Sequence, residues 1–259
     1  MKTIYLRGEN CDTMKVLKKH FDNLGHPVVR NSEERRDGMV CWGTSAQTLR
    51  GPNLNGKVNR WSKFEHFKRF DSLDVPHPIV FAFNSIHQYI DDPPPFPWLA
   101  RRAYHDNGKD IVPLKSMKDV FKLTIDLATL TRPIPVDFIS VYVPTDAEYR
   151  VWTFKNKVLA TYAKTFQGQR FTGAELGFDF YHSFLFENRN DLMDDAKLCK
   201  IAVDATKAIE LDFGAVDVLL GKDRKYYVLE VNSMPNIDCL TRVSGIRLTK
   251  AISNWVQNL

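Results

Sequence analysis

Three polar residues near the C-terminus have the types and the spacing of a metal site. Asp217 lies in the apolar run 213–220, and Glu230 and Asn232 lie in a second apolar run, 226–235. Two β-branched runs separated by a short polar stretch predict a β-hairpin. A symmetric turn places Asp217 directly opposite Glu230, and the period of two places Asn232 on the same face. The other face is predicted to be core and carries Val216, Val218, Leu220, Tyr227, Leu229 and Val231.

Two carboxylates that face each other across a strand pair repel unless a cation neutralises them. Carboxylate and amide oxygens without sulfur or imidazole suit a hard cation, so Asp217, Glu230 and Asn232 predict a site for Mg²⁺ or Mn²⁺. Mg²⁺ held in this way commonly also binds substrate phosphates. The alternative is a solvated face with a salt-bridged Asp and Glu. The neighbouring Ala215 and Leu219 disfavour that alternative, because a solvated face should not alternate with apolar residues.

The sequence around these residues resembles a known signature. The segments LDFGAVDV (211–218) and LEVNSMP (229–235) are similar to the C-terminal metal signature of the ATP-grasp ligases. The nearest branch is the carboxylate–amine ligases that resemble the ribosomal-protein glutamate ligases. The resemblance implies that the Asp, Glu and Asn bind the Mg²⁺ ions that bridge the phosphates of ATP. The chain departs from the signature at Asn236, where the family usually has Gly, and Asn tolerates the left-handed backbone conformation.

A polar loop at residues 104–110 lies between two predicted strands and contains Gly108 and Lys109. Backbone N–H groups and a lysine in such a loop suit the oxygens of a triphosphate. The segment is similar to the phosphate flap of the family, and Arg101 occupies the position of the family's arginine. The family's second loop glycine is Asp110 here. The resemblance therefore implies that Arg101, Gly108 and Lys109 bind phosphate.

Two further segments are implied to contact the nucleotide. Lys63 stands at the start of a predicted helix, 62–73, where the family has a lysine that reaches the phosphates. A solvent-exposed lysine in a first helical turn is the alternative interpretation. Phe138 and Ile139 begin the alternating segment 138–143, which matches the family's hinge, whose backbone recognises adenine.

A second predicted hairpin joins residues 148–154 to residues 158–164. Its alternation places Glu148 and Arg150 on one face, and a three-residue turn brings Lys164 opposite Glu148. The sequence EYRV (148–151) resembles a family motif in which the arginine contacts the transferred phosphate or the acyl phosphate. We assign catalytic roles to Arg150 and Lys164 and a cofactor-binding role to Glu148. An ordinary cross-strand ion network is the alternative.

The elements that would position these residues alternate in type. Short apolar segments at 3–6, 27–30 and 39–42, with a helical pattern at 12–24, predict a small open α/β lobe. Amphipathic patterns predict helices within 191–211 and at 247–259. With the resemblance, they predict an α/β (α+β) ATP-grasp fold with an N-terminal lobe (1–60), a central lobe with the flap (61–135) and a C-terminal lobe with the metal site (136–259).

Composition agrees with this prediction. The 259 residues are 44% hydrophobic and 26% charged, which is ordinary for a globular protein. The net charge of +5 favours an anionic ligand such as a nucleoside triphosphate. The four cysteines form no CxxC pair, which favours reduced thiols and a cytoplasmic protein. Neither a membrane-spanning run nor a recognised nucleic-acid motif is present, so we expect no membrane and no specific nucleic-acid partner.

The resemblance implies an ATP-dependent ligase that joins a carboxylate to an amine through an acyl phosphate. Its expected partners are ATP, Mg²⁺ or Mn²⁺, a carboxylate substrate and an amine substrate, each belonging to a small molecule, a peptide or a protein terminus. One alternative is a kinase that uses the same fold to phosphorylate a small molecule. Another is a catalytically silent nucleotide-binding module, for which Asp110 and Asn236 are the only hints.

Overall fold

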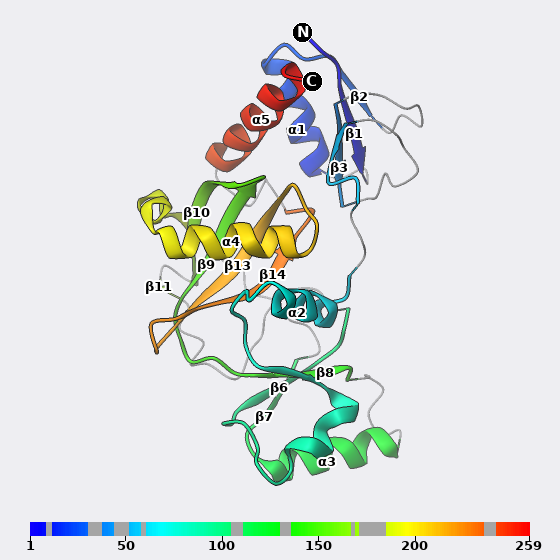
Figure 1. The fold of residues 1–259 in the computed structure, drawn as a ribbon, viewed down its shortest axis with the longest axis vertical. Coiled ribbons are helices and arrows are strands. Elements are labelled where there is room, and N and C mark those ends of the chain that lie inside the picture. The colour runs from blue at the N-terminus through cyan, green and yellow to red at the C-terminus, as the bar shows by residue number, and fades with distance from the viewer. Residues whose placement is uncertain are drawn as a thin grey trace.

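The computed structural model describes residues 1–8, 12–30, 38–43, 52–57, 61–104, 111–129, 136–166, 169–170, 185–235 and 242–259. These residues form three tiers, each built on one sheet (Figure 1). The chain runs from the N-terminal tier past the middle of the molecule to the distal tier and then returns. Both termini therefore lie at the same end of the molecule (Figure 1).

The N-terminal sheet is parallel, with the order β2-β1-β3-β4. Its elements are β1 (Ile4–Gly8), α1 (Asp12–Asn23), β2 (Val28–Arg30), β3 (Met39–Trp42) and β4 (Asn53–Leu54). Helix α1 buries Met14, Leu17 and Phe21, which lie at helical spacing. The predicted small open α/β lobe is therefore confirmed.

The distal sheet is antiparallel, with the order β5-β8-β6-β7. Its elements are β5 (Val80–Ala82), the 3₁₀ helix η1 (Phe83–Tyr89), β6 (Trp98–Arg101), β7 (Val112–Leu114), α3 (Met117–Ala128) and β8 (Phe138–Val141). Helix α3 was not predicted from the sequence. The sequence does contain a signal for its start, which is a serine at the N-cap position, Ser116. In the structure the side chain of Ser116 accepts a hydrogen bond from the backbone N–H of Asp119.

The third sheet, which we call the main sheet, has the order β11-β10-β9-β13-β14, with β12 paired to β10. Its elements are β9 (Thr145–Phe154), β10 (Lys157–Phe166), β11 (Gln169–Arg170), β12 (Leu185–Asn188), the 3₁₀ helix η2 (Asn190–Asp194), α4 (Ala196–Ala208), β13 (Phe213–Gly221) and β14 (Tyr226–Asn232). Helix α4 packs on one face through Leu198, Ala202 and Ala205. The predicted helix within 191–211 is thus present, but its first turns form η2 instead.

Two helices connect the tiers. Helix α2 (Lys63–Ser72) begins at a capping box, in which Ser62 and Glu65 exchange side chain to backbone hydrogen bonds. Its Phe67 and Phe70 belong to the same core as α4 and the main sheet. Helix α5 (Arg242–Gln257) begins five residues before the predicted start and returns to the N-terminal tier, where it contacts α1.

A buried asparagine joins the N-terminal tier to the main sheet. The Oδ1 atom of Asn55 accepts hydrogen bonds from the backbone N–H groups of Asp212 (2.7 Å) and Phe213 (3.1 Å). Its Nδ2 donates to the Phe213 carbonyl at 2.9 Å, and the Trp42 ring stacks on Phe213. A fully buried amide that satisfies three backbone groups fixes the start of β13 relative to β4.

Two elements pair or pack with a sheet other than that of the lobe to which the sequence assigned them. Strand β8, predicted to open the third lobe, pairs with β5 and β6 of the distal sheet. Helix α2, predicted within the second lobe, packs on the main sheet. The boundaries after residues 60 and 135 stay a prediction.

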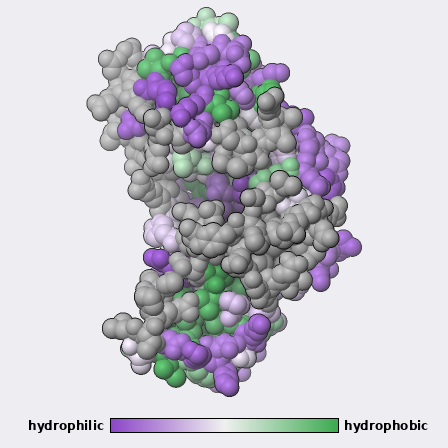
Figure 2. Space-filling view, turned by 180° about the vertical axis from the view of Figure 1, so that it is seen from behind, coloured by the Kyte–Doolittle hydropathy of each residue, from purple (hydrophilic) through white to green (hydrophobic). Residues whose placement is uncertain are grey.

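On the face seen from behind, hydrophilic residues occupy a recess at the height of the main sheet, and apolar residues show on the distal tier (Figure 2). Within the part of the chain that the structure describes, no helix has the length and apolarity needed to cross a membrane.

Candidate active site

The β13–β14 hairpin brings the two predicted carboxylates together. Asp217 is the Cα partner of Glu230, as predicted, and Asn232 pairs with Ala215 on the same face. The loop is shorter than predicted, with Arg224 in the left-handed conformation, and the extra residue is a bulge at Leu229. From Glu230 onward, the bulge restores the predicted pairing of β14 with β13.

Because of the bulge, the buried face of β14 before Glu230 is the opposite of the predicted one. Val228 pairs with Val218 and is fully buried, and Tyr226 is buried beside it. Tyr227 and Leu229, which the simple alternation assigned to the core, are only partly buried. One added residue in a strand of period two exchanges the faces on its far side, which explains the difference.

The β9–β10 hairpin uses the same arrangement. Lys157 pairs with Phe154 around a turn that contains Lys155 in the left-handed conformation, so the turn is one residue shorter than predicted. A register shift at Leu159 compensates for it. The predicted contact between Lys164 and Glu148 is therefore present, with the Nζ of Lys164 2.7 Å from Oε1 of Glu148.

The main sheet places a cation beside the carboxylate pair. Strand β9 lies next to β13, and Arg150 is the Cα partner of Asp217. The guanidinium donates two hydrogen bonds to the carboxylate, from Nε to Oδ1 and from Nη2 to Oδ2, both at 2.7 Å. Burial acts to lower the pKa of Arg150, but the contact with Asp217 outweighs it, so the arginine stays charged. Glu230, Asp217 and Arg150 therefore form one row across three strands.

Glu230 also has a cation of its own. The Nζ of Lys63, the first residue of α2, lies 2.8 Å from Oε2 of Glu230. The Nδ2 of Asn232 donates to Oε1 of the same carboxylate at 3.2 Å. Burial acts to raise the pKa of Glu230, but the Lys63 ammonium holds it well below its ordinary value. Glu230 is therefore ionised at neutral pH. The contact between Lys63 and Glu230 was not predicted from the sequence.

Lys164 and Glu148 lie on the same face as this row. Burial acts to lower the pKa of Lys164, but the charges of Glu148 and Asp217 hold it above its ordinary value. Lys164 is therefore a cation at neutral pH and does not serve as a base in this state. The described geometry agrees with the alternative of a cross-strand ion network, and the catalytic role of Lys164 stays a prediction.

Arg101 ends β6 and faces the same region. Its Nε is buried and has no hydrogen-bond partner, and its guanidinium lies 6.0 Å from the centre of the Phe138 ring. Burial lowers the pKa of Arg101, and the Glu230 and Glu148 charges oppose that effect. A partly buried arginine with a buried, unused Nε donor suits an incoming anion such as a phosphate.

Asp137 supports the position of Arg101 and was not predicted from the sequence. Its carboxylate accepts a hydrogen bond from the backbone N–H of Ala103 at 2.6 Å. Its own N–H donates to the carbonyl of Arg101 at 2.9 Å. Nothing in the local sequence distinguishes this Asp from a surface residue, because its partners come from β6.

The remaining predicted nucleotide contacts are placed as follows. Phe138 and Ile139 are fully buried in β8, which is paired on both sides, and their role in adenine recognition stays a prediction. Strands β6 and β7 flank the predicted flap and pair with each other. Gly108, Lys109 and Asp110 lie outside the described residues, as does Asn236.

The residues on the main sheet fit a hard divalent cation. Asp217, Glu230 and Asn232 offer carboxylate and amide oxygens from neighbouring positions of one hairpin face. Lys63 and Arg150 show that positive charge is accommodated at both carboxylates. Among the described residues no group of three or more His, Cys, Asp or Glu side chains is arranged around one point. The predicted set of two carboxylates and an amide is not such a group.

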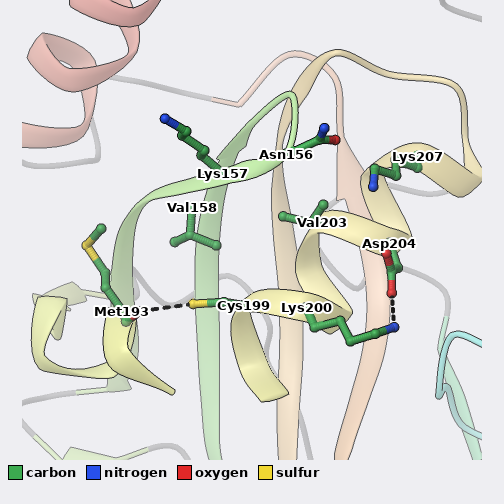
Figure 3. Close-up of a pocket in the computed structure, with 9 residues that line it drawn as sticks. All are labelled: Asn156, Lys157, Val158, Met193, Cys199, Lys200, Val203, Asp204 and Lys207. Carbon is green, nitrogen blue, oxygen red and sulfur yellow. Dashed lines mark hydrogen bonds and ion pairs between the residues drawn. The ribbon is translucent and has the colours of Figure 1, made fainter. Parts of the chain in front are cut away.

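A separate surface hollow of about 480 Å³ lies between the β9–β10 turn and α4 (Figure 3). Val158, Val203 and Met193 line it, with lysines at its rim. Lys200 is paired with Asp204 at 2.5 Å, and the Cys199 thiol donates to the Met193 carbonyl at 3.2 Å. The hollow contains none of the predicted site residues.

Comparison with known families agrees with this geometry. The family of RimK-like ATP-grasp domains matches residues 83–256, which include the whole main sheet. The chain belongs to the RimK-like ATP-grasp family. A probable alpha-L-glutamate ligase of Haemophilus influenzae (strain PittEE) is 38% identical over 66 residues. That match covers 26% of this chain and 21% of the relative, so the chain spans about a fifth of the relative's length in it.

Solved structures share the fold over nearly the whole chain. The ATP-grasp ligase PsnB, complexed with a minimal precursor, Mg and ADP, superposes with a TM-score of 0.70 at 11% identity, covering 98% of each chain. The D-alanine–D-alanine ligase of Bacillus anthracis gives a TM-score of 0.59 at 14% identity, covering 100% of this chain and 98% of that one. The predicted ATP-grasp fold is therefore confirmed.

Proposed function

We propose that this RimK-like ATP-grasp protein is an ATP-dependent ligase that joins a carboxylate to an amine. The observation that supports this best is the row Glu230–Asp217–Arg150 across β14, β13 and β9. It places oxygen ligands for a cation directly beside a guanidinium that suits a phosphate. The sequence similarity to a probable glutamate ligase and the fold similarity to ATP-grasp ligases support the same reaction class.

The residues of this chain divide into two groups in the proposed reaction. Asp217, Glu230 and Asn232 would hold Mg²⁺, which supplies charge neutralisation to the phosphates when bound. Lys63 and Arg101 would bind phosphate oxygens and orient ATP. Such positioning and charge neutralisation are what phosphoryl transfer needs most.

Arg150 would stabilise the charge that develops as the γ-phosphoryl group moves to the substrate carboxylate. The product of that step is an acyl phosphate, which the amine attacks with release of phosphate. Lys164 is a charged neighbour of this row and would bind the same anionic groups.

The reaction can be tested directly. We expect ADP and phosphate in equal amounts with an amide product, only when both a carboxylate and an amine substrate from a panel of amino acids and peptides are present. Hydroxylamine in place of the amine should intercept the acyl phosphate as a hydroxamate. A stable phosphorylated product with no need for an amine would replace the ligase with a kinase, and tight ATP binding with no turnover on the panel would favour a regulatory module.

A further inference from the structure

Each carboxylate of the candidate metal site is paired with a cation of the chain itself. Lys63 lies 2.8 Å from Glu230, and each of the two side chains is 24% exposed. Arg150 binds Asp217 through two hydrogen bonds, with exposures of 18% and 8%. In this state the positions that a divalent cation needs are already neutralised.

These pairs affect how a metal ion would enter. A divalent cation that binds Glu230 without a nucleotide must displace Lys63 and then lies close to the displaced ammonium. Like charges within a few ångströms repel, and the half-buried setting screens them poorly. A phosphate that accepts Lys63 removes this repulsion and frees Glu230.

Lys63 is well placed to change partners. It is the first residue of α2, and its backbone N–H donates to the carbonyl of Ala103 at 3.0 Å, two residues after Arg101. The capping box at Ser62 fixes the helix start. The backbone of Lys63 is therefore held between β14 and the segment predicted to bind phosphate, and a flexible four-carbon side chain carries its ammonium group.

We propose that Lys63 exchanges between Glu230 in the nucleotide-free chain and a phosphate oxygen in the nucleotide complex, so that the divalent metal and the nucleotide bind as a pair. This inference rests on the proposed function, since it assumes the same Mg²⁺ and ATP site. It assigns to Lys63 a second role, the exclusion of free metal, in addition to holding phosphate.

Lys63→Met tests this through two affinities with opposite expected changes. The affinity for Mn²⁺ alone, measured by electron paramagnetic resonance without nucleotide, should rise about tenfold because Glu230 loses its internal cation. The affinity for a fluorescent ATP analogue in the presence of EDTA should fall about tenfold because a phosphate contact is lost. A lysine that only stabilises the fold would not raise the Mn²⁺ affinity.

The matched control is Lys68→Met, which removes an exposed lysine of the same helix that lies over the Phe64 ring, and it should change neither affinity. Lys63→Gln repeats the test with a polar side chain, and thermal unfolding verifies that each variant is folded. If the wild-type protein binds Mg²⁺ with the ATP analogue but Lys63→Met leaves the Mn²⁺ affinity unchanged or lowers it, the inference is wrong. If the wild-type protein binds neither, the proposed function fails and the inference fails with it.

Discussion

Asp217→Asn should lower turnover by about a thousandfold or more, which corresponds to about 4 kcal/mol of transition-state stabilisation. The substitution keeps the size of the side chain but removes the negative charge that the proposed metal requires. It also leaves Arg150 without the carboxylate that now binds it twice. Calorimetry should show a matching loss of affinity for the ATP analogue with Mg²⁺, and little change without Mg²⁺.

Asp204→Asn is the matched control, because Asp204 pairs with Lys200 on the exposed face of α4. It should leave both turnover and affinity unchanged. Removing one partner of a buried ion pair also destabilises the fold, by about 3 kcal/mol. Turnover is therefore compared only under conditions in which urea unfolding shows that each variant is folded. Equal Mg²⁺-dependent affinity in Asp217→Asn and the wild-type protein would refute the metal assignment.

Arg150→Met should lower kcat by about a hundredfold or more while changing the affinity for the ATP analogue by less than about tenfold. The reason is that the proposed partner of Arg150 is charge that develops during transfer and is smaller in bound ATP. Single-turnover kinetics with a saturating carboxylate substrate would measure the chemical step apart from product release.

Arg224→Met provides the control, since Arg224 lies in the β13–β14 turn and its side chain is 79% exposed. It should leave kcat unchanged. Arg150→Lys should recover part of the lost rate, because an ammonium keeps the charge but not the two-fold hydrogen bonding of a guanidinium. A loss of affinity as large as the loss of kcat would assign Arg150 to ground-state binding of ATP.

The parts of the site that local patterns determine could be predicted from the sequence. The alternation of apolar and polar residues on either side of a short polar turn gave both hairpins and the facing pairs Asp217–Glu230 and Glu148–Lys164. The bulges at Leu159 and Leu229 were not predictable, because a longer turn and a shorter turn with a bulge give the same register beyond them.

Contacts between distant segments could not be predicted. The pairing of Lys63 with Glu230 and the buried hydrogen bonds of Asn55 to β13 depend on how the tiers pack. The repeat of apolar residues along one element does not show such a contact, since the two partners lie more than 150 residues apart in the sequence. For the same reason β8 was assigned to the third lobe, although its pairing partners are β5 and β6.

A crystal structure with Mg²⁺ and a non-hydrolysable ATP analogue would test the central claim most directly. The expected result is a metal ion bound by oxygens of Asp217, Glu230 and Asn232, with Lys63 moved from Glu230 to a phosphate and Arg150 beside the γ-phosphate. A nucleotide bound elsewhere, or one bound here with the Lys63–Glu230 and Arg150–Asp217 pairs intact and no metal between the carboxylates, would contradict it.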